Sequence, residues 1–450
     1  MFEKLQLKNP RILLINPAFR YTGTDKFPLG LGYIAAHLQH MGMDPIIVDE
    51  QGNTPFVGKK MLNELKVDII GITSTTPAFH RVKEILRSIK TLPVKERPLV
   101  FMGGTHATFC PEEVLHAGVD IIIRGEADKT IYELFTNPID QIKGISYIFE
   151  NIIKHNPVQE VVSKIDDIPF PARKLFQKDL YPVMGLTTSR GCPFRCLYCS
   201  ATSFWHNISP TVRYHSLKYV EKELEQIANQ GYDLVCFEDA TFTVKKNRAK
   251  EIAQLFITNQ KLEKMVWSCE TRPDMLDSEL IKIFDETKCI MLNIGIESVS
   301  ETVLLKNNRK TDLETIKRSI LDIKKTNITS QVLLIFGLPG ETPESVQETI
   351  DFLEKYKPDR VLLSLAAAYP GTGLAEDSSR INPPLDWRKK FAGHGGDQFT
   401  ELYRPQTLSI DEYYRLADKL LMVVRKINTE KYQDFKKKQN RFLKKVKKDN

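Results

Sequence analysis

Three closely spaced cysteines are the residues of this sequence with the clearest chemistry. Cys192, Cys196 and Cys199 lie in the run Ser-Arg-Gly-Cys-Pro-Phe-Arg-Cys-Leu-Tyr-Cys, which spans residues 189–199. Thiolates at these spacings can hold three irons of a 4Fe-4S cube, because cysteine is the usual ligand of such clusters. The fourth iron then stays open to a ligand from outside the chain.

A structural zinc site is the alternative interpretation of the same cysteines. Zinc needs a fourth ligand, such as His206 or His215, and its structural sites are usually built from two separated pairs of ligands. The sequence has no second Cys-x-x-Cys pair, which favours the cluster. The other cysteines are scattered on apolar or turn-like segments and are expected to be packing residues in a reducing compartment: Cys110, Cys236, Cys269 and Cys289.

The cysteine run resembles the signature of the radical S-adenosylmethionine (SAM) superfamily, including Tyr198 before the last cysteine. In that family the open iron binds the amino and carboxylate groups of SAM, and one electron from the cluster yields a 5′-deoxyadenosyl radical. The resemblance implies that Tyr198 packs against the adenine. It also implies a one-electron reductant such as flavodoxin or ferredoxin.

Residues 179–375 alternate between apolar strands and helical stretches, which predicts a partial, open (β/α)6 barrel of the TIM type. The chemistry of such barrels lies at the carboxyl ends of the strands, and the cysteine run follows the first strand. The expected strands are 183–188, 233–237, 265–268, 290–294, 332–336 and 360–365.

The residues around the strand ends resemble the SAM-binding motifs of the same family. Carboxylates after the second strand suit the methionyl ammonium, although exposed acids after strands are common. Arg309 resembles a family arginine that meets the methionine carboxylate, because a guanidinium fork suits that group. A carboxylate or hydroxyl after the fourth strand would bond the ribose. The SAM contacts implied are Glu238, Asp239, Glu270, Arg272, Glu297, Ser298, Arg309 and Gly337.

Residues 1–150 predict a separate doubly wound, Rossmann-like parallel sheet, because short apolar strands alternate with helical patterns there. Ligands of such a sheet bind beyond the carboxyl ends of its strands. Amphipathic stretches at 31–41 and 79–89 are long enough to be crossover helices. The expected strands are 11–15, 45–48, 68–72, 98–101 and 119–123.

Glycines and hydroxyl residues follow these strands, and the set resembles the cobalamin-binding domain found before many radical SAM domains. Small side chains let a large planar ligand approach the backbone, and hydroxyls can bond its carboxamides. The implied cobalamin contacts are Asn16, Ser74, Thr75, Gly103, Gly104, Thr105, His106, Gly125 and Glu126. No Asp-x-His-x-x-Gly run supplies a lower cobalt ligand. His106 is the one candidate near the corrin, and a hydrogen-bonding loop role for it is favoured.

Three further segments complete the chain: a linker at 151–178, a mainly helical region at 376–450 and, within it, a basic tail. Residues 411–427 predict a helix that packs on the barrel through Leu416, Leu420 and Val424. Residues 393–396 and Trp387 fit either a substrate mouth or a spacer loop. Residues 431–450 carry a net charge of +7, equal to that of the whole chain. Such a tail is usually a solvated helix, with peripheral membrane contact as the alternative.

These features predict a cobalamin-dependent radical SAM enzyme that methylates an unactivated carbon of a small-molecule, peptide or lipid substrate. The resemblance leaves open radical cyclisation or oxidation without methyl transfer, and a non-catalytic cobalamin-binding protein. A methylthiotransferase is disfavoured, because the N-terminal half has only Cys110 to bind a second cluster. No apolar run approaches the roughly 20 residues of a membrane span, so a cytoplasmic location is expected, with no nucleic-acid partner.

Overall fold

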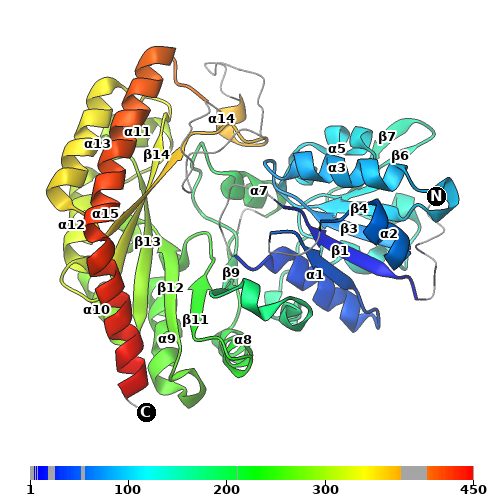
Figure 1. Cartoon of the computed structure of the whole chain (residues 1–450), viewed down its shortest axis with the longest axis horizontal. Coiled ribbons are helices and arrows are strands. Elements are labelled where there is room, and N and C mark those ends of the chain that lie inside the picture. Colours follow the sequence, from blue (N-terminus) through cyan, green and yellow to red (C-terminus); the bar gives the residue numbers. More distant parts are fainter. Residues whose placement is uncertain are drawn as a thin grey trace. The chain divides into compact units, whose positions relative to one another are not determined.

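The computed structural model describes Leu5, Leu7 and residues 9–18, 26–51, 56–209, 211–376 and 403–448, with side chains described to residue 431. The chain forms two compact units (Figure 1). The first comprises residues 1–182 and 204–213, and the second comprises residues 183–203 and 214–450. Trp387 and residues 393–396, considered above as a substrate mouth, lie outside the described residues.

The first unit is built on a seven-stranded sheet in the order β2-β1-β3-β4-β5-β6-β7. The strands β1 to β5 are parallel and almost wholly buried. Burial on both faces explains their near-continuous Ile, Leu and Val sequences. The strands are β1 (Ile12–Asn16), β2 (Ile46–Asp49), β3 (Ile69–Thr73), β4 (Leu99–Gly103), β5 (Ile121–Ile123), β6 (Ile145–Phe149) and β7 (Ile152–His155).

Helices connect these parallel strands, as the sequence predicts. The two expected amphipathic stretches are confirmed as α1 (Leu29–His40) and α3 (Phe79–Lys90). The apolar face of α3 is buried through Val82, Ile85 and Ile89. The remaining helices are short: α2 (Lys59–Leu65), α4 (Thr105–Phe109), α5 (Pro111–Ala117) and α6 (Thr130–Glu133).

An antiparallel hairpin of β6 and β7 extends the sheet, and the sequence analysis did not predict it. Its turn places Glu150 at φ 51° and Asn151 at φ 64°. Two successive residues with positive φ are typical of the type I′ turn, whose twist matches that of paired strands. Glutamate is unusual in such a turn, so the run Phe-Glu-Asn-Ile gave no clear hairpin signal. Strand β7 falls within the segment expected to be a linker.

The second unit contains six parallel strands in the order β15-β14-β13-β12-β11-β8. Each predicted strand of the partial barrel is confirmed, and β8 and β15 form the two open edges. The strands are β8 (Met184–Leu186), β11 (Leu234–Phe237), β12 (Val266–Thr271), β13 (Cys289–Glu297), β14 (Thr329–Phe336) and β15 (Arg360–Leu365), with the two-residue strands β9 (Ser189–Arg190) and β10 (Arg213–Tyr214).

Helices alternate with these strands and bury their apolar faces. A fully buried Trp267 lies among Phe237, Phe256 and Phe284, with ring centroids 4.8–5.8 Å from its own. Buried Cys236, Cys269 and Cys289 confirm the expected packing role for these three, whereas Cys110 of the first unit is only half-buried. The helices are α8 (Leu217–Asn229), α9 (Lys246–Thr258), α10 (Ser278–Glu286), α11 (Glu301–Lys306), α12 (Leu313–Ile323), α13 (Pro343–Tyr356) and α14 (Gly373–Glu376).

A long C-terminal helix, α15 (Ile410–Lys448), packs beside α13 and β15 (Figure 1). The predicted face of Leu416, Leu420 and Val424 is buried. The side-chain amide of Asn428 accepts from the Val361 nitrogen at 2.8 Å and donates to the Val361 carbonyl at 2.9 Å, so it pairs the backbone of one residue on the edge strand β15. Among helices in the described ranges, none is long and apolar enough to span a membrane.

Candidate active site

The three cysteines lie on the loop that follows β8 and β9, at the carboxyl end of the first barrel strand. Cys192 and Cys196 are buried, and Cys199 is half-buried. The backbone nitrogen of Leu197 donates to the Asn307 carbonyl at 3.2 Å, and Leu374 donates to the Leu197 carbonyl at 3.1 Å. The loop is therefore anchored at its centre by two other segments of the barrel unit.

The three cysteines do not have the compact ligand spacing of a single zinc site. Among the described residues, the three sulfurs and a histidine nitrogen do not form a set of ligand atoms that meets within 4.8 Å, as one zinc ion would require. Cluster cysteines ligate different irons and lie farther apart. Burial raises the pKa of the Cys192 and Cys199 thiols, so a cluster bound there would have to displace a proton from each.

Arg272 contacts one of the three cysteines directly. Its Nη1 donates to Cys196 Sγ at 3.7 Å, while Asp274 accepts from Nε at 2.9 Å and from Nη2 at 3.0 Å. The guanidinium also lies 3.8 Å from the ring centroid of Phe194, another residue of the loop. The structure thus places this predicted SAM residue in contact with Cys196, a predicted cluster ligand.

Tyr198, Arg309 and Glu297 form a buried polar group. Arg309 Nη1 lies 3.1 Å from Tyr198 Oη and 3.7 Å from Glu297 Oε1, and Nη2 donates to the Gly295 carbonyl. Burial raises the pKa of Glu297 and raises that of Tyr198 well above its usual range. The Nε of Arg309 is buried without a hydrogen-bond partner. An unsatisfied guanidinium donor of this kind fits an incoming carboxylate, such as that of SAM.

The backbone around this group has an unusual conformation at Glu297 and a glycine at position 295. Glu297, at the end of β13, has φ 65°, a left-handed conformation that is uncommon for a glutamate and typical of functional sites. A Cβ at Gly295 would lie 2.6 Å from Glu297 Oε1. Glycine at 295 therefore makes room for the Glu297 carboxylate.

The adjacent acids after β11 have different surroundings. Asp239 is fully buried and accepts from the Thr188 nitrogen at 3.0 Å, from Thr188 Oγ1 at 2.9 Å and from Ser189 Oγ. Asp239 therefore holds Thr188 and Ser189, which directly precede the cysteine loop, in place. The carboxylate of Glu238 lies against Gly185, where a Cβ would approach it to 2.6 Å. Sequence reasoning missed Arg248, which donates to Thr188 Oγ1 at 2.8 Å, because nothing in its spacing marks it.

The other predicted SAM residues lie at or near the same strand ends. Glu270 is within β12 rather than after it. Ser298 Oγ accepts from the Ser300 nitrogen at 3.2 Å, which is a local turn contact. Gly337 has φ 87°, and a Cβ there would lie 2.8 Å from Tyr413 of α15. Glycine at 337 therefore also leaves room for the C-terminal helix to pack against this turn.

The predicted cobalamin residues come together at the carboxyl ends of β1, β3, β4 and β5, which are neighbours in the first sheet. Two backbone hydrogen bonds join the loops after β3 and β4. The backbone N–H of Ser74 donates to the Gly103 carbonyl, and the backbone N–H of His106 donates to the Ser74 carbonyl. Gly104 has φ 96°, and a Cβ there would lie 2.7 Å from the Ser74 oxygen. A Cβ at Gly103 would meet only the Ile123 oxygen, at 3.8 Å.

This edge fits a large planar ligand through its small residues. Thr75 is exposed, and Gly103, Thr105 and Gly125 are half-buried, so their backbones are accessible. Two other predicted contacts already have partners in the same unit. Asn16 donates to Asp49 at 2.9 Å, and Glu126 forms a two-point ion pair with Arg213 at 2.6 and 3.0 Å.

His106 is buried rather than exposed at this edge. Its Nδ1 hydrogen-bonds Thr76 Oγ1 at 3.2 Å, its ring packs 4.2 Å from that of Phe79, and its Nε2 lies 3.6 Å from Glu113 Oε2. Burial lowers the pKa of His106 to about 4, so the ring is neutral at pH 7. Both ring nitrogens face side chains of its own unit, which agrees with the favoured loop role.

Known proteins share both halves of this arrangement. The Radical SAM superfamily profile matches residues 186–353, and the B12 binding domain profile matches residues 16–135. An uncharacterized methyltransferase of Pyrococcus horikoshii is 30% identical over 404 residues, which cover 85% of this chain and 86% of that protein. The chain belongs to the cobalamin-binding radical SAM enzymes. Its cofactors are a 4Fe-4S cluster, SAM and cobalamin.

Other members of this group extend the likeness. The anaerobic magnesium-protoporphyrin IX monomethyl ester cyclase of Cereibacter sphaeroides is 25% identical, covering 82% of this chain and 63% of its own length. The structure of the radical SAM methyltransferase TsrM from Kitasatospora setae, with cobalamin and cluster bound, has a TM-score of 0.74 at 17% identity and covers 93% of this chain and 89% of that one. It supports the fold of this cobalamin-binding radical SAM enzyme.

Proposed function

We propose that this enzyme transfers a methyl group to an unactivated carbon of its substrate. The observation that carries the proposal is one chain holding both an anchored cysteine loop and a glycine-lined corrin edge, with a methyltransferase relative matching 85% of its length. When bound, the cluster and SAM supply an adenosyl radical, and cobalamin supplies the methyl group.

The chain's own residues have distinct parts in this function. Cys192, Cys196 and Cys199 would hold the cluster, and Arg272 sets the charge beside one of them. Arg309 would bind the methionine carboxylate through its unsatisfied Nε, with its orientation fixed by Tyr198, Glu297 and the Gly295 carbonyl. Fixing a guanidinium before the ligand arrives lowers the entropic cost of binding.

The first experiment is anaerobic reconstitution with iron, sulfide and hydroxocobalamin, followed by reductant and SAM. Bound corrin, 5′-deoxyadenosine and S-adenosylhomocysteine are then quantified, with Cys192→Ala as the control. Methyl transfer predicts bound corrin and both nucleoside products, with deoxyadenosine lost in the variant. Absence of corrin binding in folded protein would contradict the proposal.

Radical cyclisation or oxidation without methyl transfer is the second candidate function, and the likeness to the Cereibacter sphaeroides cyclase favours it. The same experiment separates the two. Cyclisation predicts deoxyadenosine without S-adenosylhomocysteine, because no methyl group leaves SAM. Neither product from cluster-loaded protein would instead favour a non-catalytic cobalamin-binding role.

We also propose a cytoplasmic enzyme that takes its electron from a flavodoxin or ferredoxin and acts on a small-molecule, peptide or lipid substrate, without a nucleic-acid partner. The lysine-rich end of α15 would provide peripheral contact with an anionic membrane. Sedimentation with phosphatidylserine vesicles at low and high salt tests that contact, which added salt should abolish.

A further inference from the structure

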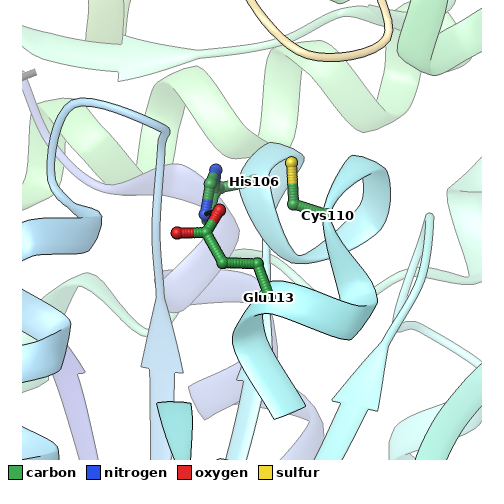
Figure 2. A group of neighbouring side chains, drawn as sticks. All are labelled: His106, Cys110 and Glu113. Atoms are coloured by element: carbon green, nitrogen blue, oxygen red, sulfur yellow. Dashed lines mark ion pairs between the residues drawn. The ribbon is translucent and has the colours of Figure 1, made fainter. Parts of the chain in front are cut away.

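A group of potential metal ligands lies in the cobalamin-binding unit, away from the cluster cysteines in sequence. It consists of His106, Cys110 and Glu113, and one ligand atom from each lies within 4.8 Å of the other two (Figure 2). These residues carry a nitrogen, a sulfur and an oxygen donor. Neither the cluster nor the SAM contacts use them.

The local backbone brings the three side chains together. His106 lies in α4 (Thr105–Phe109), Glu113 lies in α5 (Pro111–Ala117), and Cys110 is the residue between the two helices. The Cys110 nitrogen donates to the His106 carbonyl at 2.8 Å at the end of α4, and the Val114 nitrogen donates to the Cys110 carbonyl at 3.1 Å at the start of α5. Cys110 itself has φ −127° and ψ 50°, so the chain turns there between the two helices, and the three ligand atoms come together at that turn.

The histidine has the surroundings of a metal ligand. Its side chain is 3% exposed, and its Nε2 is buried without a hydrogen-bond partner and turned toward Glu113 (Figure 2). Its other nitrogen, Nδ1, is held by Thr76 Oγ1. Metal-bound histidines typically use the second ring nitrogen in this way, which fixes the tautomer and the ring orientation.

We propose that His106 Nε2, Cys110 Sγ and Glu113 Oε2 bind a divalent first-row metal ion such as Zn²⁺, with a fourth position open to water. Ligands at zinc bond lengths in a tetrahedron lie about 3.3–3.8 Å apart. The nitrogen and oxygen already lie 3.6 Å apart, and Glu113 is half-exposed and able to adjust. Binding breaks the Cys110 S–H bond and releases its proton to solvent.

Charge supports the same assignment. A Cys110 thiolate and the Glu113 carboxylate together balance a divalent cation, with His106 neutral. Lys83 of α3 also faces the group, and its ammonium donates to the other carboxylate oxygen, Oε1, at 2.8 Å. That contact leaves Oε2 to the metal. A bound ion would brace the segment after Gly103 and Gly104, which carries predicted corrin contacts.

The test uses full-length protein in which the cluster cysteines are replaced, C192A/C196A/C199A, prepared without cobalamin and titrated with Co²⁺. One equivalent should produce a thiolate-to-cobalt charge-transfer band with tetrahedral d–d bands. Cys110→Ser should remove the charge-transfer band. Glu113→Gln should weaken metal binding about tenfold or more, because even the loss of a residue that only supports a metal ligand typically costs that much affinity. Glu112→Gln, an exposed neighbour outside the group, should change nothing.

Zinc content of the cluster-loaded wild-type enzyme provides a second readout. Dialysed protein should retain one zinc ion, and the ion should be lost in Glu113→Gln but kept in Glu112→Gln. No charge-transfer band and no retained zinc would overturn the proposal, as would equal affinity in the Glu113 and Glu112 variants. Because the Glu113 side chain is 49% exposed, its replacement should leave the fold intact, which the circular dichroism spectrum of the variant checks.

Discussion

At the scale of single residues, Arg272 is a cation in direct contact with one of the predicted cluster cysteines. It donates to Cys196 Sγ, and Asp274 and Phe194 fix its position. A hydrogen bond and a positive charge beside a cluster thiolate stabilise the reduced state, which carries one more electron.

We therefore expect Arg272→Gln to lower the reduction potential of the cluster. The shift should be on the order of tens of millivolts, measured by titration followed by electron paramagnetic resonance. Arg272→Lys keeps the charge and should shift the potential less. An unchanged potential in the glutamine variant would show that Arg272 has only a structural role.

Glu341 is a second residue whose environment has a measurable consequence. Burial raises its pKa to about 7. Its Oε1 lies 2.6 Å from Ser345 Oγ, which is also 2.9 Å from the Thr342 carbonyl. One serine proton cannot serve both acceptors, whereas a protonated Glu341 can donate to Ser345 while Ser345 donates to Thr342. The neutral acid thus completes the hydrogen bonds.

This pKa predicts how stability depends on pH. Because the folded pKa lies above the unfolded one, the folded state binds more protons between about pH 4.5 and pH 7. Stability should fall as pH rises through that window, by up to about 3 kcal/mol, and then level off. Urea midpoints at pH 5, 6, 7 and 8, compared between wild type and Glu341→Gln, test this. The variant should lose that part of the slope, and parallel slopes would contradict the assignment.

At the scale of elements, the adjacent glycines at the end of β4, Gly103 and Gly104, have different parts in the predicted corrin edge. A Cβ at Gly104 would meet the Ser74 backbone at 2.7 Å in a left-handed conformation, whereas a Cβ at Gly103 finds only ordinary contact. Gly104→Ala should cost about 1–3 kcal/mol. Gly103→Ala should keep stability within about 0.5 kcal/mol but weaken cobalamin binding. Thermal midpoints and corrin titrations measure both, and unchanged corrin affinity in Gly103→Ala would argue against this edge as the site.

The connection between β8 and the cysteine loop depends on Asp239. Asn at 239 would present an amide group to donors from Thr188 and Ser189, so one hydrogen bond would become a clash of donors. We expect Asp239→Asn to cost about 2 kcal/mol and to reduce iron content after reconstitution. Glu238→Gln is the matched neighbour and should retain iron. Equal iron contents in the two variants would show that Asp239 does not stabilise the cysteine loop.

At the scale of the whole molecule, the chain divides into two compact units with separate cofactor residues. We expect Cys192→Ala to lose the cluster but bind cobalamin normally, and Gly103→Ala to weaken cobalamin binding while still forming the cluster. Iron content and corrin absorbance of each variant measure this. Loss of both cofactors in either variant would show that the two sites depend on each other.

The sequence by itself determined the two cofactor-binding folds and marked the cysteine run that is expected to hold the cluster. Those features are local: hydrophobic runs, helical periodicity and a fixed cysteine spacing depend on residues close together in the chain. The same locality predicted the buried face of α15. The hairpin β6–β7 escaped prediction because its turn places a glutamate at positive φ.

Only the tertiary structure decided what each polar residue contacts. Asp239 and Glu238 are adjacent in sequence, yet their contacts differ. Asp239 accepts hydrogen bonds from Thr188 and Ser189, whereas the Glu238 carboxylate lies against Gly185. Arg272 meets a cysteine 76 residues away, and Arg309 meets a tyrosine 111 residues away. Such contacts arise when parallel strands bring their carboxyl ends to one edge, where the partner of each side chain depends on register and burial rather than on spacing along the chain.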